Sequence, residues 1–195
     1  PDFLVFTATA SAYSIIMNGL PELVSVLFPK CTTLTGTGSN GCPLNLANCP
    51  KLTTIDFSSL QYIKGYINLS YDPLLNNADF PELTNATYIQ TNNSIKLQSV
   101  YFPKLATGNP YIQLCSPYGT ETYPLLSNIN FSSLQISKYI LIRRTICQYL
   151  NFSALTTCAG MIIGYNSALL QLNCPVFVTK TVSNTSFNII EITQN

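Results

Sequence analysis

Charge is scarce in this sequence of 195 residues, and histidine is absent. Only 9% of the residues are charged, with nine Lys plus Arg against eight Asp plus Glu. Because no basic surface is available to neutralise phosphates, we expect neither nucleic acid nor an anionic membrane as a partner. Because Ser-His-Asp and Cys-His arrangements need a histidine base, we predict that the protein is not an enzyme.

Long apolar runs and CxxC pairs are also missing. No apolar run approaches the ~18 residues that a transmembrane helix requires, so we expect no membrane span. Without CxxC pairs or histidine, zinc and thioredoxin-type sites lack their usual ligands, and we expect no metal and no cofactor. The first residues, Pro1-Asp2-Phe3, include neither an initiator Met nor a charged signal region. We therefore expect a processed mature form or a part of a longer protein.

Seven cysteines are present, and we interpret most of them as disulfide partners in an oxidising compartment. The spacing of Cys31, Cys42 and Cys49 suggests one local bridge. Links between neighbouring segments would use Cys115, Cys147, Cys158 and Cys174. The odd count leaves one thiol free, buried or paired between molecules.

Six Asn-x-Ser/Thr sequons predict N-linked glycans on an extracellular, secreted or cell-surface protein, although this number exceeds chance only mildly. Their asparagines are Asn68, Asn85, Asn92, Asn130, Asn151 and Asn184.

One recurring pattern determines the predicted fold. It consists of an apolar residue, a second one three positions later, and a Phe-like residue five positions after the first. Successive copies lie 29, 23, 22, 29, 21, 22 and 18 residues apart. The copies begin at Leu23, Leu52, Leu75, Leu97, Leu126, Cys147, Leu169 and Phe187. We predict an all-β, single-domain β-solenoid of about eight coils of roughly 22 residues, with short parallel strands stacked on one another.

Alternation along an extended chain places the Phe-like residues on the inner side of the first strand of each coil. Proline follows this position directly at Pro29, Pro81, Pro103 and Pro175, where it would end the strand. The predicted core column contains Phe28, Phe57, Phe80, Phe102, Phe131 and Phe152.

A second strand is predicted about ten residues after each Phe, with Ile inward and Tyr, Asn or Gln outward. These strands span residues 66–69, 88–90, 111–114, 139–142 and 161–163. Each coil would then have two strands and two turns, and we expect little helix.

A single domain is expected over residues 1–195. It would comprise an N-terminal strand and first coil in 1–22, repeats in 23–186, and a partial terminal coil in 187–195. Gly-rich and Pro-containing segments at 35–41 and 116–119 predict loop insertions near 32–50 and 115–126.

The repeats resemble those of receptor L-domains, a leucine-rich-repeat-like family. Phe80-Pro81-Glu82-Leu83, Phe102-Pro103-Lys104-Leu105 and residues 95–100 carry this resemblance. Similar repeats occur in growth-factor receptor ectodomains, in lipid-anchored fungal cell-wall proteins and in BspA-type surface proteins of protists and bacteria. The resemblance implies a parallel-strand solenoid on a cell surface, but no particular ligand. The sequence departs from those families because their Gly-Gly corner is reduced to Gly65 and the lipid-anchor signal is missing.

An outward column is the candidate partner-binding surface. Stacked aromatic rings beside amides can form a platform for sugar rings or another protein, or they can simply reinforce the stacking of the coils. The column contains Tyr66, Tyr88, Tyr111 and Tyr139, with Asn68, Gln90 and Gln113 beside them.

Two weaker candidates are charged. Asp56 and Asp79 occupy the same position of adjacent coils and form a conceivable carboxylate pair, although an outward polar position is the simpler interpretation. Arg143-Arg144 is either an anion-binding pair or a solvated corner.

Low charge, sequons, cysteines and apolar strand-forming segments at both ends together suggest a function. We expect an extracellular, glycosylated structural or surface-coat protein that self-associates end to end into a fibre or layer. The alternative is a recognition ectodomain that binds a glycan or a protein.

Overall fold

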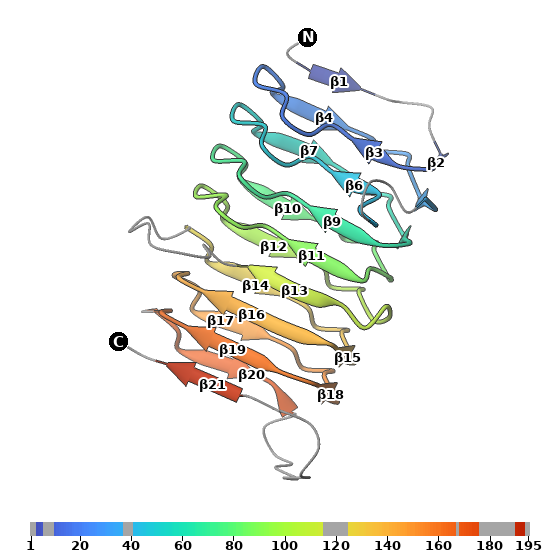
Figure 1. Cartoon of the computed structure of the whole chain (residues 1–195). Helices are drawn as coiled ribbons and strands as arrows, with labels where there is room; N and C mark the ends of the chain where they lie inside the picture. The colour runs from blue at the N-terminus through green and yellow to red at the C-terminus, as the bar shows by residue number, and fades with distance from the viewer. Residues whose placement is uncertain are drawn as a thin grey trace.

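The computed structural model describes residues 3–5, 10–36, 41–114, 125–166, 168–175 and 190–193. In these segments the chain forms an all-β solenoid of short parallel strands without an α-helix (Figure 1). This confirms the predicted fold class. The number of coils stays a prediction because segments near both ends lie outside the described residues.

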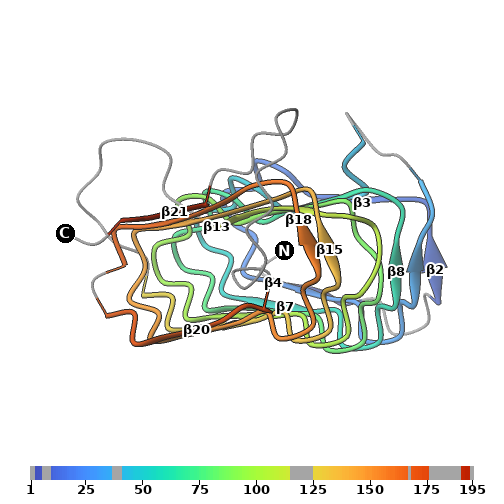
Figure 2. The same cartoon turned by 90° about the horizontal axis from the view of Figure 1, so that it is seen from below.

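Each coil follows a flattened path with two broad sides and one short side (Figure 2). We call the first broad side the Phe side, because a core Phe directly follows most of its strands. Its strands are β1 (Phe3–Val5), β4 (Ser25–Leu27), β7 (Thr54–Asp56), β10 (Asn77–Asp79), β12 (Ser99–Tyr101), β14 (Asn128–Asn130), β17 (Tyr149–Asn151) and β20 (Gln171–Asn173).

The second broad side, the Tyr side, is a continuous 8-stranded sheet. Its strands are β3 (Ile15–Ile16), β6 (Leu44–Asn45), β9 (Tyr66–Asn68), β11 (Tyr88–Gln90), β13 (Tyr111–Leu114), β16 (Tyr139–Arg143), β19 (Met161–Gly164) and β21 (Ile190–Thr193). Four of them carry the outward tyrosines. The Phe side, in contrast, consists of one 3-stranded and one 5-stranded sheet, and no ladder joins β7 to β10.

The short side corrects the prediction of two strands per coil. Its strands are β2 (Ser11–Ala12), β5 (Thr33–Leu34), β8 (Tyr62–Ile63), β15 (Ile136–Ser137) and β18 (Thr157–Cys158). They are two residues long, and isolated bridges at Asn85 and Thr107 continue this side between β8 and β15. Segments this short show no periodicity in the sequence, so the repeat pattern could not reveal them.

The predicted loop near 32–50 is also corrected. This stretch contributes β5 and β6, and Leu34, Leu44 and Leu46 are fully buried. Leu44 pairs with both Ile15 and Ile67, so it continues the inward Ile column of the Tyr side. Residues 37–40 lie outside the described residues, as do residues 115–124 of the other predicted insertion.

The predicted Phe column forms the centre of the core. Phe28 is 4% exposed and the other five rings are fully buried. Neighbouring rings stack with centroids 4.9–5.8 Å apart and planes within 15° of parallel. Each buried Phe contributes about 1.5–3 kcal/mol through removal of apolar surface from water, and each ring pair about 0.5–1.5 kcal/mol more. The coils are therefore held together through this column.

A left-handed corner joins the Tyr side to the Phe side of the next coil. The positive φ values along this corner are 71° at Gly19, 60° at Asn48, 63° at Tyr71, 57° at Asn93, 57° at Arg144 and 56° at Tyr165. Side chains other than Gly rarely adopt this conformation. Hydrogen bonds between coils offset the cost, since the Asn48 N–H donates to the Ser70 carbonyl at 3.0 Å and the Tyr71 N–H to that of Asn92 at 2.7 Å.

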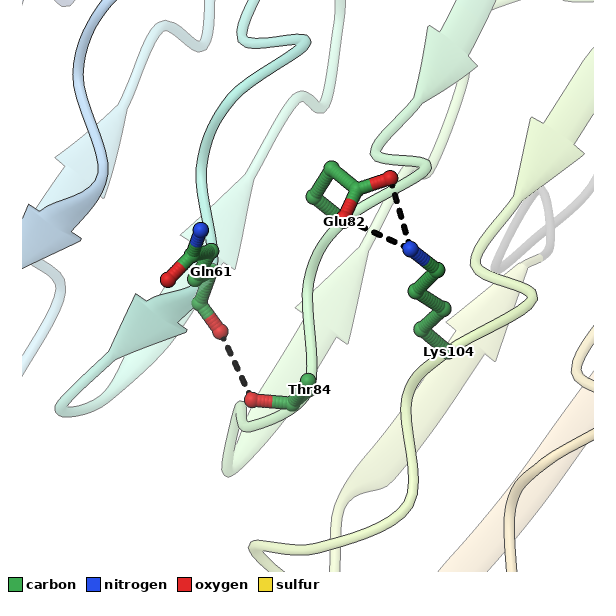
Figure 3. A network of polar contacts seen from close by, with 4 residues as sticks. All are labelled: Gln61, Glu82, Thr84 and Lys104. Atoms are coloured by element: carbon green, nitrogen blue, oxygen red, sulfur yellow. Dashed lines mark hydrogen bonds and ion pairs between the residues drawn. The ribbon is translucent and has the colours of Figure 1, made fainter.

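On the outer surface, polar side chains also connect neighbouring coils (Figure 3). The Thr84 hydroxyl donates to the Gln61 carbonyl at 2.9 Å, and Lys104 Nζ bonds both carboxylate oxygens of Glu82 at 2.8 and 2.7 Å. Exposed ion pairs of this kind contribute only about 0–1 kcal/mol. The surface contacts therefore supplement a stack that the core stabilises.

Truncation in the middle of the Phe column tests this arrangement. We expect Phe102→Ala to lower the free energy of unfolding by about 3–5 kcal/mol, because it leaves a cavity between Phe80 and Phe131. Urea denaturation followed by circular dichroism measures the change. Tyr101→Ala, at the neighbouring outward position, is the control and should cost clearly less. Equal losses for the two variants would contradict the inward placement of Phe102.

Candidate interaction surface

The predicted tyrosine column exists on the Tyr side. Tyr66, Tyr88, Tyr111 and Tyr139 are direct register partners on β9, β11, β13 and β16. Each ring lies 5.0 Å from the next, with interplanar angles of 45°, 17° and 24° along the column. Tyr66 is the most exposed ring at 40%. Parallel pairing without a register shift is sufficient to bring the four rings together.

An amide column runs beside the tyrosines, two residues further along each strand. Asn45, Asn68, Gln90 and Gln113 are register partners in successive coils. Asn68 Nδ2 donates to Asn45 Oδ1 at 3.3 Å. The Tyr88 hydroxyl donates to Gln113 Oε1 at 2.5 Å and so connects the two columns. The result is a flat polar surface built from one repeated pair of residue types.

The stacking decides what this surface can present. Tyr88, Tyr111 and Tyr139 are stacked, so neighbouring rings cover part of each face, whereas Tyr66 at the end of the column is tilted by 45° relative to Tyr88 and is 40% exposed. A sugar that stacks on an open ring face would find such a face only at an end of the column. Hydrogen bonding to hydroxyl and amide groups therefore dominates the chemistry of the column, and its rings reinforce the contact between coils.

Small residues mark both ends of the tyrosine column. The register that pairs Ile140 with Met161 places Gly160 opposite Tyr139, whose ring lies so close that a Cβ on Gly160 would come within 2.5 Å of it. At the other end, the pairing of Leu44 with Ile67 places Pro43 opposite Tyr66. The column thus covers four coils. It ends at Gly160, where a Cβ would clash with Tyr139, and at Pro43, which has no aromatic ring.

The predicted glycosylation sites differ in accessibility. Asn92 is only 3% exposed, so its side chain cannot carry a sugar in the folded protein. Asn68 and Asn85 are half-buried, and the Asn85 amide donates to the Thr107 hydroxyl at 3.1 Å. Asn184 lies outside the described residues.

The remaining two sequons, at Asn130 and Asn151, have a structural role. Asn130 Oδ1 accepts a hydrogen bond from the Ser132 N–H at 2.9 Å, and Asn151 Oδ1 accepts one from the Ser153 N–H at 3.1 Å. Asp56 makes the same contact with Ser58 at 2.9 Å. Such Asx turns end the strand and turn the chain. The Asn-Phe-Ser sequence is therefore favoured by the turn itself, whether or not a sugar is attached.

Most of the described cysteines are buried in the structure. Cys31, Cys42, Cys49, Cys147 and Cys158 are free thiols, so the bridges predicted from the cysteine count do not form among these five. Cys31 and Cys147 occupy Leu positions of the repeat, and Cys174 occupies a Phe position. Burial raises the pKa of the Cys42 and Cys158 thiols to about 11, which disfavours the reactive thiolate. Cys115 lies outside the described residues.

Asp56 and Asp79 do not form an observed pair. Asp56 uses its carboxylate in its own turn, and Asp79 accepts a hydrogen bond from the Ser99 hydroxyl at 2.8 Å. They also lie on β7 and β10, between which the ladder is interrupted. Within the described segments, no cluster of three or more His, Cys, Asp or Glu residues could hold a metal ion.

The two arginines occupy the end of β16. Arg143 is its last residue, and Arg144 adopts the left-handed corner with its guanidinium carbon 5.8 Å from the centre of the Tyr165 ring. This distance is within the range of a cation–π contact. The contact makes Arg144 part of the corner and thus favours the structural interpretation of the pair.

Sequence analysis missed one buried acidic residue. Asp72 had no assigned role because it does not share the position of Asp56 and Asp79 in the repeat. In the structure it is fully buried, and desolvation raises the pKa of its carboxyl group from 3.8 to about 7. The sequence indicates the burial of Asp72 only through its alignment with Ser94 and Asn166 in the repeat. That alignment becomes visible only once the position of the left-handed corner is known.

Comparisons with protein-family models, with curated proteins and with solved structures found no match for this chain. Over the part of the chain that the structure describes, no helix has the length and apolar character needed to cross a membrane.

The accessibility of the sequons can be tested directly. When the protein is produced in a secretory eukaryotic host, we expect glycans at Asn130 or Asn151 and none at Asn92, because Asn130 and Asn151 are half-buried in turns whereas Asn92 is buried. Peptide mapping with mass spectrometry, before and after enzymatic deglycosylation, measures occupancy at each site. Full occupancy at Asn92 in folded protein would contradict the observed burial.

Proposed function

We propose that this chain is an extracellular, non-enzymatic structural or surface-coat protein that carries N-linked glycans and associates end to end. One observation carries the proposal: all the ladders run parallel along one stack, and the described strands at its two ends pair on one side only. At one end these strands are β1, β2 and β3, and at the other they are β18, β20 and β21.

Unpaired strand edges recruit further strands unless charge, proline or a covering segment prevents it. The two ends of a parallel solenoid differ from each other, so the end of one copy fits the opposite end of the next. Such heterologous contacts that do not close produce a filament. The low overall charge supports this association because little electrostatic repulsion opposes it.

The resemblance to receptor L-domain and BspA-type repeats supports the extracellular location, as do the half-buried sequons in the turns at Asn130 and Asn151. The free thiols give this location no support. Enzymatic activity is not part of the proposal, because no histidine occurs in the chain and the two candidate carboxylates serve in a turn and in a contact with Ser99.

Charge at one end of the stack tests the association. Gln171 and Asn173 are exposed on β20, and we expect Gln171→Lys with Asn173→Lys to abolish concentration-dependent growth, because lysines on an edge strand oppose pairing. Multi-angle light scattering over a wide range of concentration measures particle mass, and electron microscopy shows filaments.

The control carries the same two charges on strands that are paired on both sides, as Ser25→Lys on β4 with Asn128→Lys on β14, and should assemble like the wild type. A wild-type chain that stays monomeric at all concentrations would contradict the proposal. Equal assembly by the edge variant and the control would instead exclude β20 as the contact.

The second candidate is recognition of a glycan or protein by the tyrosine and amide columns. The regular row of hydroxyl and amide groups on a flat sheet favours it. If this is the function, Tyr88→Ala with Tyr111→Ala should reduce binding on a glycan array at least about tenfold, the loss expected from about 1.4 kcal/mol. Tyr62→Ala with Tyr149→Ala removes two exposed tyrosines elsewhere and should have no effect. Equal binding by both double variants would exclude this surface.

A further inference from the structure

A column of buried polar side chains lies inside the left-handed corner. Six residues directly follow a left-handed one at this corner in the described coils. Leu20 is exposed, and the Thr145 hydroxyl donates to Asn166 Oδ1 of the next coil at 2.7 Å. We call the other four, Cys49, Asp72, Ser94 and Asn166, the corner column; their exposed fractions are 0%, 0%, 1% and 4%. Each begins a turn in which the N–H three residues later donates back to its carbonyl, as Leu75 does to Asp72 at 3.1 Å.

Three members of the corner column donate a hydrogen bond to the preceding coil. Cys49 Sγ donates to the Met17 carbonyl at 3.0 Å, and Ser94 Oγ donates to the Leu69 carbonyl at 2.7 Å. Asn166 Nδ2 donates to the Ile142 carbonyl at 3.4 Å. In every case the acceptor lies three residues before the equivalent position of the preceding coil. A buried side chain that donates to the preceding coil is therefore the feature these three positions share.

Asp72 reproduces the arrangement of Asn166 except for this donor. Its Oδ1 accepts the Cys49 N–H at 2.8 Å, just as Asn166 Oδ1 accepts the Thr145 N–H at 3.0 Å. The other oxygen, Oδ2, is buried and has no hydrogen-bond partner. Asp72 Oδ2 thus corresponds to Asn166 Nδ2. The equivalent acceptor for Asp72 lies three residues before Cys49 and is the Leu46 carbonyl.

A carboxylate does not fit this position. Both of its oxygens are acceptors. Oδ2 would therefore be buried without a hydrogen-bond donor, and the equivalent partner in the preceding coil is a carbonyl, which is also an acceptor. A protonated carboxyl group has the same shape as the Asn166 amide, with one acceptor and one donor. We propose that Asp72 is protonated in the folded protein, that Oδ2–H donates to the Leu46 carbonyl, and that loss of this proton weakens the contact between two coils.

The surroundings of Asp72 favour the neutral form. The preceding coil contributes the Cys49 thiol, whose pKa is raised by burial first and also by the charge of Asp72, and the two described ion pairs lie elsewhere. The next coil contributes the neutral Ser94, whose Oγ accepts the Asp72 N–H at 3.3 Å. No cation in these contacts compensates a negative charge, in agreement with the raised pKa.

The sign of the pH dependence follows from this proton. Between the ordinary aspartate pKa of 3.8 and a folded-state pKa of about 7, the folded protein keeps a proton that the unfolded chain has lost. Stability from this group is therefore complete below the lower value and decreases as the pH rises to the upper one. Within this window we expect the unfolding equilibrium constant to increase up to about tenfold per pH unit.

The test is the pH dependence of urea unfolding in wild type, Asp72→Asn and Asp72→Ser. Asn and Ser reproduce the occupants at positions 166 and 94, so both variants should fold and should lose this dependence. Asp79→Asn, an exposed aspartate with the same change of charge, is the control and should keep the wild-type slope. Infrared difference spectroscopy at pH 5 should show the C=O stretch of a protonated carboxyl group in the wild type and not in Asp72→Asn.

Two results would overturn the inference. One is an Asp72→Asn variant whose unfolding constant changes with pH as steeply as that of the wild type. The other is a wild-type infrared spectrum at pH 5 without the C=O stretch of a protonated carboxyl group, which would show that Asp72 is ionised. This spectrum is recorded on the wild type alone, so absence of the band decides the question even if the substitutions at position 72 prevent folding. Neither result bears on self-association.

Discussion

Contact between equivalent side chains of successive coils is the interaction on which the whole structure depends. One coil cannot hide its own apolar face, so each Phe ring is buried only when further coils stack before and after its own. The register is fixed by the same requirement, because a shift of one residue would turn the Phe column toward solvent. The alignment of the core therefore also fixes which surface residues are neighbours. Tyrosines pair with tyrosines and amides with amides in successive coils because the buried residues of the same strands are in register.

This dependence explains why candidate functional features have structural explanations. The stacked tyrosine rings, the sequons at Asn130 and Asn151, and the thiols of Cys31 and Cys147 each occupy a repeated position whose geometry favours that residue type. A repeat unit reuses one local solution in coil after coil. Evidence for function must therefore come from features that the geometry does not require, such as the edges of the end strands, which pair on one side only within the described residues.

Most of the fold could be predicted from the sequence because it depends on repeated apolar side chains. The Phe column is where the pattern places it, and β11 (Tyr88–Gln90) and β13 (Tyr111–Leu114) have the predicted bounds. The left-handed corner was missed because Tyr71, Arg144 and Tyr165 carry no sequence signal for positive φ, and hydrogen bonds between coils stabilise it. Pairing of cysteines was predicted from their number, whereas their positions in the repeat place them in separate buried columns.

The central claim is that equivalent aromatic rings lie one coil apart in a single buried column. Nuclear Overhauser effects between selectively labelled Phe rings test it most directly in solution. We expect cross-peaks between Phe57 and Phe80, Phe80 and Phe102, Phe102 and Phe131, and Phe131 and Phe152. Pairs separated by two coils should give none. Cross-peaks between Phe57 and Phe102, or the absence of contacts between consecutive rings in a folded sample, would contradict the stacked solenoid.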